Sequence, residues 1–494
     1  MDSAASPIVT TAKGPVRGFW RGRPGGDGSS AAFLGIPFAQ PPVGPLRFAA
    51  PVPPEPWTEV RDATAYGPTA QRGDKGETLI PEPSIPGASI LNVNVFTPDP
   101  SAGPALPVMV WIHGGGYVDG SPASEWYDGR AFNRDGVVTV SVSYRLGFDG
   151  FGWIDGAPSN RGVRDWIAAL EWVQENIAAF GGDPGRVTIA GQSAGGGAVL
   201  TLLAIPTAQH LFHHTISLSG ALGDIPRERV EARSRLLAEL AGCTPDLDGF
   251  RSVPEKRILQ LQPKAALLGA TGVAAATDVL RHGLPWGPVV DGDLIERPTV
   301  DALRGGAGAG KPLLLGAADD EFTMVLDDLR GRLRLIPGSW LLARVLRDRA
   351  TRRAYLAANR PQRRKGTAAL LGRYVTDVVF RSLVVRVAEA RASAPTWAYR
   401  FAWVSPARGW ALHCLDVPFW FDCLDEPHVA RIAGDAPPQS LATAMHAAAV
   451  SFIRDGDPGW PLWSLEPGTA RVFGAAPADP PISPTAYDNA LPLA

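Results

Sequence analysis

Short apolar runs alternate with longer polar stretches through the first half of the chain. Residues 107–112 (PVMVWI) are too short for a helix and run directly into glycines, whereas residues 136–144 (GVVTVSVSY) are rich in β-branched side chains. Both patterns predict buried strands. We expect further core strands at residues 187–190, 215–219, 313–315 and 396–401.

The clearest helix in the sequence begins near Gly162. Its apolar residues recur with the helical period and form one continuous stripe, made up of Val163, Trp166, Ile167, Leu170, Val173, Ile177 and Phe180. Gly181 and Gly182 are expected to end this helix, and Pro184 prevents it from resuming. A shorter helical run is expected at residues 198–204.

The order of these elements indicates the fold class. Strands that alternate with helices predict an α/β protein with a central, mostly parallel sheet and helices on both faces. Large helical excursions are expected at about residues 225–280 and 325–392, and the proline-crowded first 60 residues indicate loops after a short apolar run at 33–38. With no internal repeat and no clear linker, we interpret residues 1–494 as a single domain.

Composition and charge narrow the function classes. The 494 residues are 45% hydrophobic and include 15 Trp, which argues against disorder despite 55 Gly and 47 Pro. The formal net charge of −2 provides no overall field for nucleic acid or anionic lipid. We interpret the Arg-rich run from Arg344 to Lys365 as a solvated helix face rather than an anion-binding surface. No stretch of 18 apolar residues occurs, so we expect no membrane partner.

Cysteine usage and the N-terminus suggest a cellular location. The chain has three cysteines, an odd number without a CxxC spacing, so neither a disulfide scaffold nor a zinc site is expected. The N-terminal residues lack the charged start and apolar core of a signal peptide. We therefore expect a soluble, cytoplasmic enzyme.

A candidate nucleophile lies in the sequence Gly191-Gln192-Ser193-Ala194-Gly195. The G-x-S-x-G pattern alone is weak, because a plain glycine-rich turn could produce it. Here a predicted strand runs directly into the pattern and a helix follows, which is the arrangement of a nucleophile elbow. Ser193 is therefore the candidate nucleophile.

The sequence His113-Gly114-Gly115-Gly116 follows another predicted strand and suggests an oxyanion site. Backbone N–H groups of consecutive glycines can approach a developing oxyanion because no Cβ blocks them. The N–H group after the nucleophile, here that of Ala194, is the second donor in such hydrolases. A phosphate cradle is the alternative, but no Lys-Ser/Thr pair follows the glycines. His113 has no second ligand at metal spacing and is expected to be structural.

Segments along nearly the whole chain resemble type-B carboxylesterases, the α/β-hydrolase family that includes the cholinesterases. The resemblance spans more than 400 residues and is carried by GPVRG (14–18), FLGIPFAQPPVGPLRF (33–48), VMVWIHGGGY (108–117), FGGDPGRVTIAGQSAGG (180–196), HCLDVPFWF (413–421) and FIRDGDPGWP (452–461). It implies an α/β-hydrolase fold, a catalytic triad and oxyanion donors, at Ser193, Glu321, His413, Gly115, Gly116 and Ala194. It also implies a structural ion pair between Arg145 and Asp165.

The base can be chosen among the histidines by their surroundings. In this fold the base follows the acid along the chain, which leaves His413, His428 and His446. His446 lies in an Ala-rich run that reads as a helix, and His428 lies in a polar loop. His413 follows the strand predicted at 396–401 and is the candidate base.

Three carboxylates compete for the role of the acid, because Asp319, Asp320 and Glu321 are consecutive. Three carboxylates cannot all face one imidazole without repulsion. The resemblance and the longer side chain favour Glu321, and we expect Asp319→Asn to be nearly neutral. The alternative is that all three decorate a surface loop.

Several positions depart from the family pattern. Phe322 replaces a glycine, Ala221 a serine and Trp410 a glycine, and Arg47 lacks its usual Glu partner. Apolar side chains around the site would favour bulky apolar esters, and the candidate pocket residues are Phe148, Leu284, Trp286, Phe322, Trp410 and Trp420.

Together these features predict a serine hydrolase that cleaves small-molecule carboxylic esters through an acyl-enzyme, without metal or cofactor. The same machinery could act on carbamates, amides or thioesters. A catalytically inactive binding module is disfavoured because the serine is present. The sequence leaves the oligomeric state open between monomer and dimer.

Overall fold

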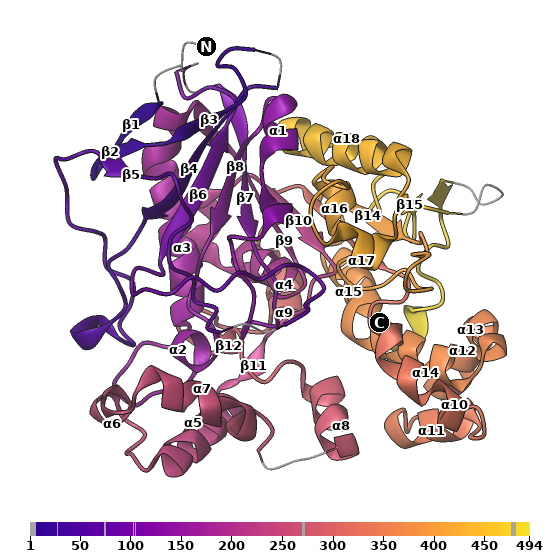
Figure 1. The fold of residues 1–494 in the computed structure, drawn as a ribbon. Helices are drawn as coiled ribbons and strands as arrows, with labels where there is room; N and C mark the ends of the chain where they lie inside the picture. The colour runs from indigo at the N-terminus through magenta and orange to yellow at the C-terminus, as the bar shows by residue number, and fades with distance from the viewer. Residues whose placement is uncertain are drawn as a thin grey trace.

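The computed structural model describes residues 6–26, 28–73, 76–101, 103, 105–268, 272–475 and 481–494. Within these residues, eleven strands form one large sheet in the order β16-β15-β14-β13-β10-β9-β7-β8-β6-β4-β3 (Figure 1). The strands are β3 (Phe19–Arg21), β4 (Ser30–Pro37), β6 (Asn92–Thr97), β7 (Leu106–Ile112), β8 (Val138–Val142), β9 (Gly182–Gln192), β10 (His214–Leu218), β13 (Leu313–Ala318), β14 (Thr396–Phe401), β15 (Ala470–Phe473) and β16 (Ile482–Ser483).

The centre of this sheet is parallel and its margins are antiparallel. All pairings from β8 through β7, β9, β10, β13 and β14 to β15 are parallel. The outer pairs β3–β4, β4–β6, β6–β8 and β15–β16 are antiparallel. The prediction of a mostly parallel sheet in an α/β fold is confirmed.

The prediction of loops holds for residues 38–60, where the structure has only the 3₁₀ turn Gly44–Leu46, but it missed the strands in residues 6–37. That segment contains β3 and β4, together with the small hairpin of β1 (Ile8–Thr11) and β2 (Gly14–Arg17). The apolar run at 33–38 belongs largely to β4, which pairs with β6. Because β6 lies about sixty residues further along the chain, no local sequence pattern predicts this pairing.

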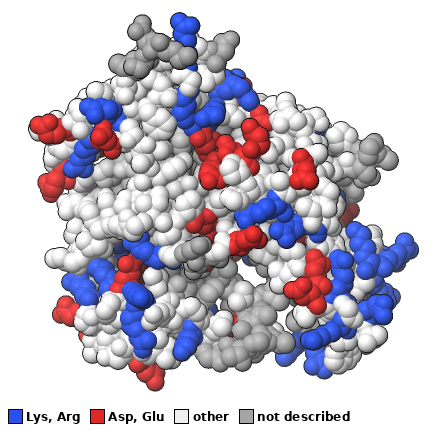
Figure 2. Space-filling view, viewed as in Figure 1, with Lys and Arg blue, Asp and Glu red and all other residues white. Residues whose placement is uncertain are grey.

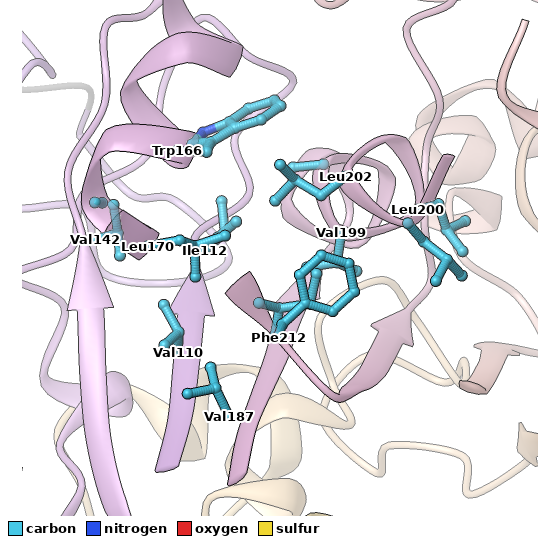
Figure 3. Packing of buried hydrophobic residues seen from close by; sticks show 14 of the residues in the cluster. Val110, Ile112, Val142, Trp166, Leu170, Val187, Val199, Leu200, Leu202 and Phe212 are labelled. Carbon is cyan, nitrogen blue, oxygen red and sulfur yellow. The ribbon is translucent and has the colours of Figure 1, made fainter. Parts of the chain in front are cut away.

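Helices cover both faces of the sheet because successive strand residues point to opposite sides. On one face, Val110, Ile112 and Val187 pack against Trp166 of α3 (Arg161–Asn176) and Val199 of α4 (Ala194–Ala204) (Figure 3). The other face is covered by helices that include α1 (Arg130–Arg134), α16 (Val417–Trp420) and α18 (Gln439–Asp455).

The predicted amphipathic helix is α3, which continues as a 3₁₀ turn over Ile177–Phe180. Gly181 ends it with a left-handed φ of 83°. The second predicted helix, α4, starts four residues earlier than expected, directly after Ser193. No helix of the described residues is long and apolar enough to cross a bilayer.

Two helical excursions leave the carboxyl ends of β10 and β13, which are neighbouring parallel strands. The first contains α5 (Arg227–Ala241), α6 (Leu247–Ser252), α7 (Glu255–Ala266) and α8 (Gly272–His282). The second contains η5 (Thr323–Leu329), α10 (Arg330–Leu333), α11 (Gly338–Val345), α12 (Arg349–Ala358), α13 (Arg360–Lys365), α14 (Thr367–Thr376), the π-helical turn Asp377–Arg381 and α15 (Ser382–Ala390). Helices α5 to α8 of the first excursion and α10 to α14 of the second lie at the lower end of the molecule in Figure 1.

Candidate active site

Ser193 lies at a sharp turn between the end of β9 and the first residue of α4. Its backbone has φ 58° and ψ −122°, a conformation that residues other than glycine rarely adopt. A Cβ at Gly191 would collide with the carbonyl of Gly195, and one at Gly195 would collide with the carbonyl of Ile112. Both glycines are therefore needed to hold the serine, which is half-buried, in this strained position.

His413 and Glu321 form a buried pair beside this turn. Nδ1 of His413 donates to Oε2 of Glu321 over 2.5 Å, and the N–H group of His413 donates to the Glu321 carbonyl over 2.8 Å. Oε1 of Glu321 accepts from the N–H group of Ala318 over 2.7 Å. The carboxylate is therefore held by the His413 ring and by one main-chain N–H group, although Ala221 has no hydroxyl to support it.

The three consecutive carboxylates point to three different partners. Asp320 pairs with Arg373 over 3.2 Å, and both oxygens of Asp319 accept from Arg400 over 2.7 Å. Burial opposes ionisation of Asp319, but Arg400 and neighbouring arginines outweigh it and hold the pKa of this carboxyl well below its usual range. The alternative of a surface loop is wrong, because all three side chains are buried.

Two aromatic rings and one amide surround the His413 imidazole. The Phe322 ring stacks on it with centroids 4.8 Å apart and an interplanar angle of 29°, and the Phe380 ring lies at 4.9 Å. Nε2 of the imidazole lies 3.2 Å from Nε2 of the Gln192 side chain. Since Nδ1 carries the proton donated to the carboxylate, Nε2 accepts this contact in the neutral ring.

The pKa of His413 is raised well above its ordinary value. Burial by itself lowers it, but the adjacent Cys414 and the Glu321 carboxylate favour the imidazolium more strongly. A histidine with these neighbours can take up a proton from a hydroxyl and remain stabilised while charged.

The glycine loop after β7 forms a second part of the site. Gly115 has φ 104° and Gly116 φ 61°, both in the left-handed region. A Cβ at Gly115 would collide with the Asp119 carbonyl. Among the described residues, no protein group accepts a hydrogen bond from the N–H of Gly115 or Gly116. Ala194, the third expected donor, is the first residue of α4, so its N–H has no intrahelical acceptor.

A cavity of about 490 Å³ joins these parts. Ser193, His413 and all three glycines of the loop line it. Most of the remaining wall is apolar. The two excursions contribute Val279, Leu280, Leu284, Phe322, Val375, Val379 and Phe380, and Leu79, Ile80 and Tyr127 come from other segments. The predicted pocket residues Leu284 and Phe322 therefore lie where they were expected.

The other four predicted pocket residues do not line this cavity. Phe148 packs into a separate buried cluster with Trp286. Trp410 donates from Nε1 to Asp327 over 3.0 Å, and Trp420 is buried in the core under β14. Apolar character alone did not show which of these rings face the cavity and which face the core.

Several lining residues were missed by the sequence reading. Val375 and Val379 follow one another at helical spacing, and Phe380 is adjacent, but this pattern is also typical of core packing. Gln192 belongs to the G-x-S-x-G motif, yet nothing in that motif indicates that its side chain reaches the His413 imidazole. Only the folded arrangement brings these residues to the serine.

The remaining histidines lie elsewhere. His428 is exposed at the start of α17 (Val429–Ala433), and His446 in α18 contacts Asp135 over 3.0 Å. His113 is buried and stacks on Tyr144 with centroids 4.5 Å apart, and burial lowers its pKa to about 4. None of the three lines the cavity.

Two ion pairs stabilise the surroundings of the site. Arg145 and Asp165 are buried and joined by hydrogen bonds of 2.7 and 2.8 Å, as the resemblance implied. Arg47 lies 3.5 Å from Asp149, which takes the place of the usual Glu partner. The three cysteines are free, and no group of three potential ligands in the described chain is placed to hold a metal ion.

A parallel-centred sheet with a serine at a strand-to-helix elbow and a buried His–Glu pair defines an α/β-hydrolase. The chain belongs to the carboxylesterase family, whose model matches residues 5–467, and it is a carboxylic-ester hydrolase. It is similar to the para-nitrobenzyl esterase of Bacillus subtilis (strain 168), with 34% identity over 93% of each chain. It is also similar to the phenmedipham hydrolase of Pseudarthrobacter oxydans, with 34% identity over 90% of this chain and 91% of that protein.

A solved structure agrees with this assignment. The Geobacillus stearothermophilus carboxylesterase EST55 at pH 6.2 matches with a TM-score of 0.78 and 34% identity, covering 94% of this chain and 96% of that one. The sheet and the two excursions therefore belong to a fold that is already known for esterases.

Proposed function

We propose that the protein hydrolyses small apolar carboxylic esters through a covalent acyl-enzyme on Ser193. His413 serves as general base and Glu321 as the acid that orients it. The observation that carries this proposal is the 2.5 Å bond from His413 to Glu321 in a cavity that Ser193 also lines. Nucleophile, base and orienting acid are the parts that acyl transfer requires.

In the first half of the reaction, Oγ of Ser193 attacks the ester carbonyl carbon and transfers its proton to Nε2 of His413. The tetrahedral intermediate carries a negative charge on the former carbonyl oxygen. The N–H groups of Gly115, Gly116 and Ala194 donate to this oxygen. The intermediate then collapses, the carbon–oxygen bond to the alcohol breaks, and His413 gives its proton to the departing alcohol.

In the second half, a water molecule attacks the acyl-enzyme while His413 again removes a proton. The second tetrahedral intermediate expels Oγ of Ser193, which takes the proton back from the imidazolium, and the carboxylic acid leaves. Glu321 stays ionised throughout and stabilises the imidazolium. Glu321 is completely buried, and its bond to the Ala318 N–H fixes the carboxylate. The fixed carboxylate in turn keeps the His413 imidazole in one orientation.

Substrate preference follows from the cavity wall. Aliphatic and aromatic side chains dominate it, whereas polar groups gather near the glycine loop. Apolar acyl or alcohol groups gain about 25 cal/mol for each Å² removed from water. A cavity of about 490 Å³ has room for a small-molecule ester.

Two measurements test the proposal. Ser193→Ala should fold normally and lose essentially all turnover of p-nitrophenyl esters, and a fluorophosphonate probe should label the unsubstituted protein on Ser193 only. Substantial activity in the variant, or an adduct on another serine, would exclude the mechanism. Esters of increasing acyl length, run beside matched amides and carbamates, define the bond that is cleaved.

A further inference from the structure

Charge is distributed very unevenly along this chain. Residues 330–365, which we name the basic lobe, span α10 to α13 and contain eleven Arg and one Lys but a single acidic residue, Asp348. The basic lobe therefore carries a net charge of +11. Because the whole chain carries −2, the other residues together carry −13. The near-neutral net charge of the whole chain therefore gives no sign that positive charge is concentrated in the basic lobe.

The positive charges of the basic lobe face solvent. Arg332, Arg334, Arg353 and Arg364 are among eleven exposed basic residues there. Within the described chain, Arg330 alone of the lobe's basic residues forms an ion pair, with Asp327 over 3.1 Å. Figure 2 shows Lys and Arg side chains gathered over this part of the molecule. A solvated face of this charge density attracts an anionic surface.

Large apolar side chains are exposed in the same lobe. Leu335 is 81% exposed and Trp340 is 51% exposed, and Arg344 lies 4.0 Å from the Trp340 ring centroid. Immediately before the lobe, Val325 is also exposed. Phosphate contacts alone do not require such residues. Basic side chains together with exposed Trp and Leu are typical of segments that lie on anionic bilayers.

The basic lobe packs against the wall of the active-site cavity. The Thr367 hydroxyl, in the first turn of α14, donates to the Ile336 carbonyl over 2.7 Å. Val375, near the other end of α14, lines the cavity with Ser193. A surface that held the lobe would therefore lie near an apolar pocket for esters.

We propose that the basic lobe docks the protein on the surface of bilayers rich in anionic lipid head groups. Its arginines lie against the head groups, and Leu335 and Trp340 enter the interface. This peripheral contact needs no spanning helix. It also departs from two of our expectations: that the protein has no membrane partner, which rested on the net charge and on the lack of a long apolar stretch, and that the run from Arg344 to Lys365 is a solvated helix face rather than an anion-binding surface.

Vesicle flotation with the full chain tests the proposal. The protein should float with vesicles of phosphatidylcholine mixed with phosphatidylglycerol and not with phosphatidylcholine alone. Since each basic residue near an anionic surface contributes roughly a fivefold change in binding, R360Q/R363Q/R364Q should weaken binding on the order of 100-fold. L335S/W340S should also weaken it, whereas K256Q/R257Q, exposed basic residues on α7, should not.

The outcomes separate lipid from other anions and from catalysis. All variants should hydrolyse a soluble p-nitrophenyl ester at the unsubstituted rate, which shows that they are folded. No flotation with anionic vesicles, or flotation unchanged in both lobe variants, would overturn the proposal. Tight binding to RNA or DNA that the arginine variant loses and L335S/W340S retains, without flotation, would assign the lobe to nucleic acid instead.

Discussion

The side-chain amide nitrogen of Gln192 lies 3.2 Å from Nε2 of His413, the atom that accepts the proton of Ser193 in the proposed reaction. Gln192 is 1% exposed and immediately precedes the serine. Nε2 of a neutral imidazole has one lone pair, so the amide N–H and the serine hydroxyl compete for it. We therefore expect Gln192 to act as a positioning residue for the proposed base.

This contact predicts how Gln192 variants alter the pH profile. An ionised carboxylate in place of the amide favours the imidazolium, so Gln192→Glu should move the acid limb of kcat/KM to higher pH by about one unit or more. Gln192→Met, which removes the donor, should leave the limb nearly in place. An unchanged limb in Gln192→Glu would show that the amide does not contact the base in solution.

Substitutions at the three consecutive carboxylates should have clearly different effects on kcat. Glu321→Gln removes the partner that orients and stabilises the imidazolium and should lower kcat by about 10⁴. Asp320→Asn, whose side chain bonds Arg373, should retain most of kcat and lose stability. Measuring kcat of each variant, with folding checked by circular dichroism, shows which carboxylate is the acid. A crippled Asp320→Asn beside an active Glu321→Gln would mean that the acid is misassigned.

The Asp319–Arg400 pair corrects the expectation that Asp319→Asn is nearly neutral. Breaking a buried ion pair from one side costs about 3–5 kcal/mol, so this variant should unfold at lower urea concentration at pH 7. Asp62→Asn, which removes an exposed pair with Arg17, is the matched control and should cost under about 1 kcal/mol.

The effect of Asp319→Asn should depend on pH in one direction. The folded-state pKa of Asp319 is depressed, so its stabilisation is fully present above the unfolded pKa of about 3.9 and is lost as pH falls below it. The difference in unfolding free energy between the variant and the unsubstituted protein should therefore shrink from pH 7 toward pH 3. A difference that stays constant would show that shape, not charge, is responsible.

The glycine loop allows a graded test of the oxyanion donors. A Cβ at Gly116 would meet only a Val118 methyl at 3.9 Å, whereas one at Gly115 would collide with a carbonyl. Gly116→Ala should therefore fold and lower kcat by about 10- to 1,000-fold, because its left-handed φ of 61° strains the donor's position. An effect on KM alone would identify the loop as pocket wall.

Phe322 should control which esters fit. Removing its ring from beside His413 opens the cavity, so Phe322→Ala should raise kcat/KM for long-chain relative to short-chain p-nitrophenyl esters by about tenfold. Phe148→Ala is the control, since Phe148 packs in another cluster and should change stability without changing this ratio. An unchanged ratio in Phe322→Ala would place the acyl group elsewhere in the cavity.

The local backbone geometry of the candidate site was predictable from sequence. The elbow around Ser193 and the loop of Gly115 and Gly116 depend on tight turns, and a tight turn is encoded by neighbouring residues. The amphipathic period of α3 and the central strands are likewise local patterns, and the structure confirms them. His413 emerged from chain order and from the nature of the segments around its rivals.

Tertiary structure alone decided what distant segments do together. The pairing of β4 with β6, the partners of Asp319 and Asp320, and the side chain of Gln192 against the imidazole all join segments whose contact no local pattern encodes. The pocket was the largest failure, because an aromatic side chain is equally suited to a core and to a cavity wall. Whether a ring faces one or the other depends on how the two excursions pack, and that packing is a property of the whole chain.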